Sequence, residues 1–206
     1  MKSWDSCVIK EKQRWQGMMT LPRELEYRDG KIWQKPVREI ENYRKNRCCY
    51  ENVNVGESLS LKRPCRMIDL IVELQNADGI VDGSRNSGNP DQEALGVYNE
   101  FQIELARNEE YTTVFTYDRK RQILEIDRTW SGVQRDVVCT RKLQITDDRQ
   151  NLKLRFILDR NSIELFINDG SKTATTVIPT PVEADEILFH SDGNAVIQVE
   201  KYDIVL

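Results

Sequence analysis

Apolar residues recur at every second position from about residue 50 to the C-terminus, and helix-length amphipathic patterns are scarce. This period of two places alternate side chains on opposite faces, which is typical of half-buried β-strands. The pattern is clearest over 152–158 and 162–167, on either side of a turn at 159–161. We predict a hairpin here, with these side chains facing the core: Leu154, Phe156, Leu158, Ile163, Leu165 and Ile167.

Similar short segments indicate further strands. After a turn at 168–171, the Thr- and Val-rich stretch 173–178 continues the meander. The other expected strands are 66–75, 98–107, 111–118, 121–128, 137–145, 185–191 and 195–205. Short strands at this spacing predict an all-β fold, a two-sheet antiparallel β-sandwich. The turn-rich segment 81–91 is expected to be a surface loop, and 37–45 a brief helix.

The charge balance excludes some classes of protein. Lys and Arg number 30 against 34 Asp and Glu, which gives a net charge of -4. Without a basic excess to neutralise phosphates, a dedicated nucleic-acid binder is not expected. The chain has no apolar run near the ~18 residues that span a bilayer, and its first residues lack the features of a secretory signal. We therefore expect a cytoplasmic protein with no membrane partner.

The thiols and the single imidazole offer little for catalysis or metal binding. Five cysteines at irregular spacing, Cys7, Cys48, Cys49, Cys65 and Cys139, fit neither a disulfide framework nor a CxxC metal site. His190 is the only histidine and ends an apolar strand, so we interpret it as structural. No metal and no cofactor are expected. The acidic side chains near turns are interpreted as turn and surface residues: Asp127, Asp159, Glu164 and Asp169.

Several longer motifs resemble one family of enzymes. Residues 15–25 read W-x-G-x-MTLPREL, and 29–37 read DGKIWQKPV. Together they resemble the junction between the catalytic propeller and the C-terminal β-sandwich of glycoside hydrolase family 32, which contains invertases and sucrose-6-phosphate hydrolases. Segments 1–5, 124–132 and 154–170 also resemble that family, so the similarity extends over nearly the whole chain.

The resemblance implies two parts, the end of the propeller with an interdomain linker (1–36) and a C-terminal β-sandwich of the concanavalin-like lectin/glucanase type (37–206). In the family, two propeller carboxylates perform retaining hydrolysis of fructosides. The family's nucleophile motif (Trp-x-Asn-Asp-Pro-x-Gly), its Arg-Asp-Pro motif that grips the fructose and its Glu-Cys acid/base motif have no counterpart here: Arg28-Asp29 is followed by Gly30 rather than Pro, and no Glu precedes a Cys. We therefore assign no catalytic residue and expect the chain to be inactive alone.

The resemblance also suggests roles for the aromatic and basic residues. We expect the following residues to pack at an interdomain interface: Trp4, Trp15, Leu21, Pro22, Arg23 and Trp33. Arg23 can present its planar fork to a carboxylate or to backbone carbonyls. Trp130 in a turn is the candidate for sugar contact. Met18 and Met19 add to an apolar segment that needs a covering surface. The basic cluster Arg38, Arg44, Lys45 and Arg47 is interpreted as solvated charge.

The leading interpretation is an accessory domain of a sucrose-6-phosphate hydrolase, which covers the propeller, shapes its cleft or assists oligomerisation. Its partners would be the catalytic propeller, or a second copy through residues 1–36, with sucrose or sucrose 6-phosphate bound only in a complete enzyme. Two alternatives remain open. One is a free-standing carbohydrate-binding module, and the other is one half of a split glycosidase.

Overall fold

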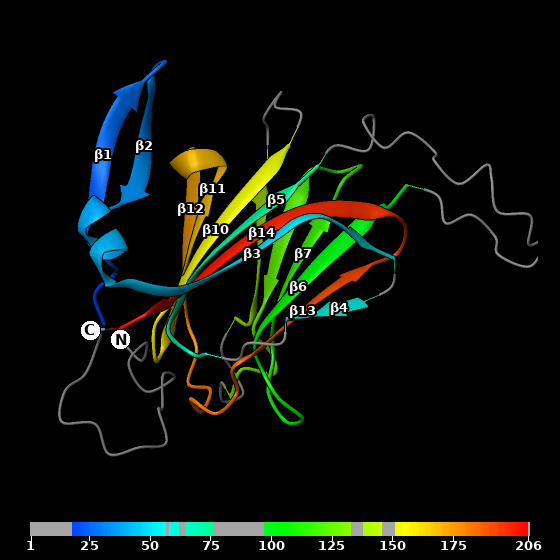
Figure 1. Ribbon diagram of the computed structural model, residues 1–206. Coiled ribbons are helices and arrows are strands. Elements are labelled where there is room, and N and C mark those ends of the chain that lie inside the picture. The colour runs from blue at the N-terminus through cyan, green and yellow to red at the C-terminus, as the bar shows by residue number, and fades with distance from the viewer. Residues whose placement is uncertain are drawn as a thin grey trace, which may run out of the picture.

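The chain forms a β-sandwich of two six-stranded antiparallel sheets, with a separate two-stranded hairpin beside it (Figure 1). The computed structural model describes residues 18–56, 58–61, 65–75, 97–132, 138–145 and 151–205. The prediction of an all-β sandwich is confirmed. The expected loop at 81–91 lies outside the described residues.

Sheet I has the strand order β12-β11-β10-β5-β14-β3. Its strands are β12 (Lys172–Val177), β11 (Ser162–Ile167), β10 (Leu152–Leu158), β5 (Ile68–Leu74), β14 (Ala195–Ile204) and β3 (Arg44–Val55). The hairpin expected around 159–161 is present, with Phe156 opposite Leu165. A short 3₁₀ helix, η3 (Asn168–Gly170), joins β11 to β12.

Sheet II has the order β4-β13-β6-β7-β8-β9. Its strands are β4 (Ser58–Ser60), β13 (Glu186–Ser191), β6 (Glu100–Arg107), β7 (Thr113–Asp118), β8 (Ile123–Asp127) and β9 (Thr140–Gln144). The strands from β6 to β9 follow one another as a meander, as their regular spacing in the sequence predicts.

The core lies between the two sheets and uses the face that the alternation predicts. Leu154, Phe156 and Leu158 on β10 are each at most 3% exposed. The predicted core residues of β11, Ile163, Leu165 and Ile167, are buried as well. Across the sandwich, the rings of Phe115 and Phe156 meet edge to face with centroids 4.9 Å apart.

Four elements precede the sandwich proper or border it without a strong signal in the sequence. The strands β1 (Arg23–Arg28) and β2 (Lys31–Pro36) pair as a hairpin that stands beside β12 in Figure 1. The 3₁₀ helix η1 (Arg38–Tyr43) follows, within the expected helical segment. β3 is an edge strand with mostly exposed side chains, so its sequence lacks the alternation that identified the other strands.

No helix among the described residues has the length and apolar character needed to cross a membrane.

Candidate functional site

A buried carboxylate on β11 holds the beginning of the hairpin against the outer face of sheet I. The side chain of Glu164 is only 2% exposed. Its Oε2 forms an ion pair with Nη2 of Arg23 and accepts a hydrogen bond from Oγ1 of Thr175 at 2.8 Å. Its Oε1 accepts a hydrogen bond from the backbone N of Leu21 at 3.1 Å. We call these four residues the Glu164 cluster. The three donors, from Arg23, Thr175 and Leu21, offset the free-energy cost of burying the carboxylate charge.

Arg23 connects this carboxylate to three strands. Its Nη1 donates to Oε1 of Gln34 on β2 at 2.8 Å and to Oγ1 of Thr173 on β12 at 3.1 Å. The guanidinium also lies over the ring of Phe166 on β11, 5.3 Å from its centroid. Of the two partners considered for Arg23, a carboxylate and backbone carbonyls, the structure shows the carboxylate of Glu164. Its place in an interdomain interface stays a prediction.

The surface role expected for Glu164 is wrong. Residues on the outer face of a sandwich are normally solvated, but Leu21 and Arg23 cover this part of sheet I. The other acidic residues do lie near turns. Asp127 accepts from the backbone N of Thr129 at 2.8 Å, and Asp159 accepts from that of Arg160 at 2.6 Å.

A second buried carboxylate binds the residues that follow the hairpin, in η1 and at the start of β3. Asp69 on β5 is fully buried, and its Oδ2 lies 2.7 Å from Nη2 of Arg44 and 2.7 Å from Nη2 of Arg155. The Nε of Arg155 donates to Oδ1 at 2.9 Å. Glu41 on η1 lies 3.5 Å from both guanidiniums. We call Asp69, Arg44, Arg155 and Glu41 the Asp69 cluster; it joins η1 and the start of β3 to the neighbouring strands β5 and β10 of sheet I.

The solvated role expected for the basic cluster is therefore wrong for Arg44. Its side chain is 15% exposed because it packs between Asp69 and the ring of Tyr202. The other three members, Arg38, Lys45 and Arg47, do lie exposed on the surface. Arg38 pairs with Glu24 in solvent, and Arg47 is exposed. Sequence reasoning missed Asp69, one of two carboxylates, with Glu73, in the mostly apolar strand sequence IDLIVEL.

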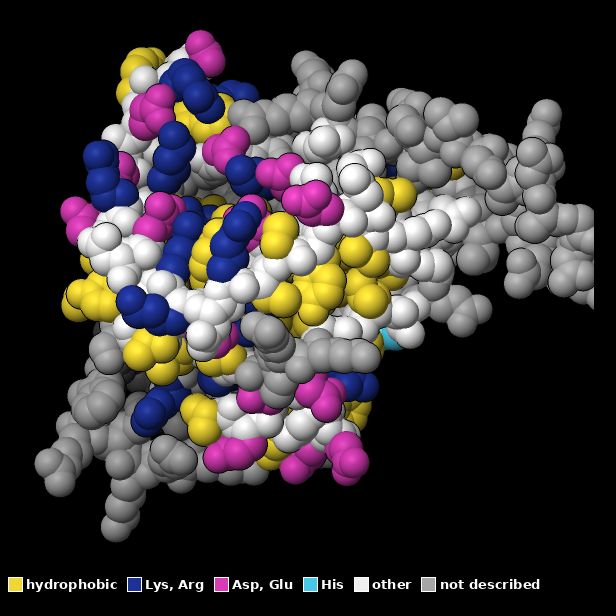
Figure 2. All heavy atoms as spheres, in the orientation of Figure 1, with side chains coloured by type: hydrophobic (Ala, Val, Ile, Leu, Met, Phe, Trp, Pro, Cys, Tyr) yellow, Lys and Arg dark blue, Asp and Glu magenta, His cyan; other side chains and the backbone are white. Residues whose placement is uncertain are grey.

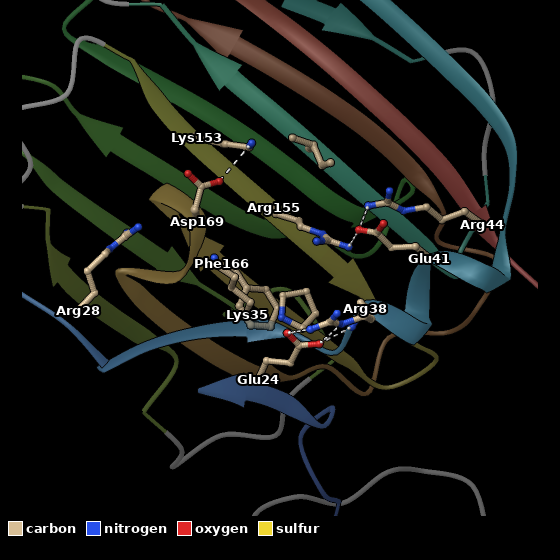
Figure 3. A pocket seen from close by; sticks show the side chains of 12 residues that line it. Glu24, Arg28, Lys35, Arg38, Glu41, Arg44, Lys153, Arg155, Phe166 and Asp169 are labelled. Carbon is tan, nitrogen blue, oxygen red and sulfur yellow. Dashed lines mark hydrogen bonds and ion pairs between the residues drawn. The ribbon is translucent and has the colours of Figure 1, made fainter. Parts of the chain in front are cut away.

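A groove lies between the hairpin, η1 and the outer face of sheet I. Its volume is about 550 Å³. Figure 3 shows Lys153 and Asp169 at one side, Arg155, Glu41 and Arg44 at another, and Glu24 with Arg38 below. Figure 2 shows positive and negative side chains interleaved over this region rather than one large patch of a single sign.

The comparisons with known proteins decide the family. Residues 39–205 match the family model described as Glycosyl hydrolases family 32 C terminal, which covers well over half of the chain. The chain belongs to this family.

Relatives of this family 32 domain are longer proteins. A probable sucrose-6-phosphate hydrolase from Vibrio cholerae is 29% identical over 179 residues, which are 86% of this chain but 27% of the relative. A sucrose-6-phosphate hydrolase from Lactobacillus gasseri is similar in structure, with a TM-score of 0.66 at 23% identity, covering 89% of this chain and 33% of that one. An exo-inulinase from Aspergillus awamori gives a TM-score of 0.69 at 19% identity, covering 93% and 36%. The chain thus spans about a third or less of these relatives' lengths.

The family 32 domain places its other predicted site residues in different surroundings. The guanidinium of Arg28 lies over the ring of Trp33 on β2, 3.6 Å from the ring centroid. The carbonyl of Pro22 accepts from the backbone N of Val37 at 3.2 Å, where the hairpin closes. Trp130 is 68% exposed and lies apart from the two carboxylate clusters. Trp4 and Trp15 lie outside the described residues.

His190 and the cysteines form no reactive centre in the described part of the chain. Nε2 of His190 lies 3.2 Å from Oε1 of Glu104 on the outer face of sheet II. Burial raises the pKa of the Cys65 thiol, which makes it a weaker nucleophile at neutral pH. The described residues contain no group of three or more His, Cys, Asp or Glu able to hold a metal ion.

The hairpin approaches the sandwich closely at Gly170, and a substitution there can test this contact. Gly170 ends η3 at φ +96°, and a Cβ added there would lie 2.1 Å from the backbone O of Gln34 on β2. We expect Gly170→Ala to lower the free energy of unfolding by about 1–3 kcal/mol, because the hairpin must shift and the left-handed φ is strained. Gly30→Ala is the matched control, since Gly30 has φ +74° but no atom within 4 Å of the added Cβ. Equal losses in urea unfolding would mean that only the φ matters.

Proposed function

We propose that this domain is the accessory C-terminal sandwich of a sucrose-6-phosphate hydrolase-like enzyme. Its role is to support a catalytic propeller by packing against it, by shaping its cleft or by assisting oligomerisation. The family membership and the short span of the chain relative to its relatives support this proposal. The observation that carries this proposal is an exposed apolar face on the hairpin. The Glu164 cluster holds that hairpin against sheet I.

That face is formed by Leu25 and Tyr27 on β1 and Ile32 on β2. Tyr27 lies opposite Ile32 in the strand register, and Leu25 is two residues from Tyr27, so the three side chains share one face. They are 68%, 78% and 60% exposed, respectively. Met19 nearby is 97% exposed. Contiguous exposed apolar side chains mark contact surfaces, and a propeller is the partner that the family resemblance implies.

The chain alone is expected to release no hexose from sucrose or sucrose 6-phosphate. Hydrolysis by this family needs an attacking carboxylate and a proton donor, and the chain has neither motif. The measurement is hexose release by the purified chain. Turnover near the enzyme range of about 1 per second would contradict the proposal.

A chimera tests the supporting role directly. Residues 21–206 of this chain would replace the matching C-terminal part of the Vibrio cholerae relative. We expect the chimera to hydrolyse sucrose 6-phosphate and the propeller without any sandwich to be unstable or inactive. The control is a chimera with Leu25→Ser, Tyr27→Ser and Ile32→Ser, which removes the apolar face and should separate the two parts. A propeller that is equally stable and active alone would refute the supporting role.

A second candidate is a carbohydrate-binding module that acts through Trp130. The turn that carries this exposed ring is well fixed. The backbone N of Thr112 donates to the Trp130 carbonyl at 3.0 Å, and both N and Oγ of Ser131 donate to the Arg128 carbonyl. An exposed indole on a fixed turn is suited to stacking on a sugar ring. Loss of sugar binding in Trp130→Ala would favour this candidate.

A further inference from the structure

The groove beside the hairpin has the dimensions of a small-ligand site. Its volume of about 550 Å³ lies within the roughly 300–1,000 Å³ typical of such sites. Three independent parts of the chain form its walls: the hairpin, η1 and the outer face of sheet I. The Glu164 and Asp69 clusters fix these walls relative to one another.

Five of the six described cations that line the groove pair with carboxylates, Lys35 among them with Glu26 on the hairpin, and the sixth, Arg28, lies over the ring of Trp33. Nζ of Lys153 lies 3.2 Å from Oδ1 of Asp169, and Nε of Arg38 lies 2.9 Å from Oε1 of Glu24. The two guanidiniums of the Asp69 cluster share Asp69 and Glu41. A strongly anionic ligand would have to compete with these carboxylates for the same donors. A neutral ligand need not separate any pair.

The paired groups still have hydrogen-bonding capacity. Arg44 and Arg155 both direct Nε and Nη2 to Asp69, which leaves Nη1 of each guanidinium on the side away from that carboxylate. The carboxylates of Glu41 and Asp169 are 50% and 43% exposed, and each oxygen has two lone pairs. A hydroxyl group both donates and accepts, so it can bind to an ion pair without disrupting it.

The groove also contains apolar surface. Ile71 on β5, Phe166 on β11 and Pro36 on β2 line it together with the charged residues. Figure 3 shows Phe166 between the Lys153–Asp169 pair and the Glu24–Arg38 pair. Apolar surface flanked by planar polar groups suits a ring that has C–H groups on its faces and hydroxyls on its rim.

We propose that this groove binds a neutral, hydroxyl-rich ligand of di- or trisaccharide size. The site belongs to the sandwich and its hairpin and requires no catalytic carboxylate, so it goes beyond the supporting role proposed above. Binding can therefore fail while the supporting role holds, and the reverse is also true.

Sucrose and raffinose are the probes, titrated into the full chain and followed by ligand-observed NMR. We expect a dissociation constant on the order of 1 mM for at least one of them. In Lys153→Gln/Asp169→Asn the binding should weaken by about tenfold. Asn is chosen because residue 169 has a positive φ of 60°, which Asn tolerates. If circular dichroism shows that this variant is unfolded, Glu24→Gln/Arg38→Gln on the opposite wall replaces it, and the same weakening of binding is expected.

The matched control is Lys142→Gln/Glu125→Gln. This pair joins a lysine to a carboxylate at 3.1 Å on the outer face of sheet II, outside the groove. Its removal should leave sugar binding unchanged. No binding of either sugar, equal weakening by the groove and control variants, or loss of binding only in Trp130→Ala would overturn the proposal. Competition by inorganic phosphate would show an anion site and would overturn it as well.

Discussion

Replacing Asp69 by alanine should lower the free energy of unfolding by about 3–5 kcal/mol. The substitution leaves two guanidiniums, those of Arg44 and Arg155, that are only 15% and 18% exposed and have lost their main partner. Half-exposed Glu41 lies 3.5 Å from both and cannot replace a carboxylate at 2.7 Å. Urea unfolding followed by tryptophan fluorescence measures the loss. Asp69→Asn, which keeps the shape and removes the charge, should also destabilise the fold.

The control for Asp69 is Glu200→Ala. Glu200 also pairs with an arginine, Arg47, at 2.9 Å, but the two side chains are 37% and 58% exposed. An exposed pair of this kind contributes about 0–1 kcal/mol. If Asp69→Ala costs no more than Glu200→Ala, the Asp69 cluster does not hold η1 and the start of β3 against β5 and β10.

Replacing Arg23 by alanine should cost about 3 kcal/mol, because it leaves the buried Glu164 carboxylate without its cation. The hydrogen bonds from Leu21 and Thr175 remain and offset part of the loss. Glu164→Gln alone should be destabilising too, and the double variant should lose less than the sum of the two. A double-mutant cycle should give a coupling free energy of about 1–3 kcal/mol.

The matched cycle uses Lys35 and Glu26, which pair at 3.1 Å on the hairpin with side chains 43% and 48% exposed. Their coupling should be about 0–1 kcal/mol. Equal coupling in the two cycles would show that burial adds nothing at Glu164, and that the hairpin is held by other contacts.

The strands were predictable wherever one face of the strand is buried and the other is exposed to solvent. In β10 the alternation of Leu152, Leu154 and Phe156 with the charged Lys153 and Arg155 identifies both the strand and its inward face, although Ile157 interrupts it. The same rule fails for β3, because it is an edge strand with almost no buried side chains. Its pairing with β14 is also irregular at two places, near Asn46 and Asn52, which both have positive φ.

The two buried carboxylates were not predictable, because their burial depends on contacts between distant parts of the chain. Glu164 and Asp69 occupy outward positions in alternating strands, which normally means solvent. Arg23 lies 141 residues before Glu164, and Arg155 lies 86 residues after Asp69. A single sequence gives no sign of such pairings. The family resemblance located the hairpin segment, but it did not show what the segment contacts.

The Glu164 cluster fixes the hairpin β1–β2 to the sandwich. Native-state hydrogen exchange of the backbone amides tests this most directly. We expect the amides of β1 and β2 to be protected in the unmodified chain and to lose about tenfold or more of that protection in Glu164→Gln, while the amides of β6 to β8 in sheet II change much less. Hairpin amides that exchange as fast as an unfolded peptide in the unmodified chain, or protection that is unaffected by Glu164→Gln, would contradict the claim.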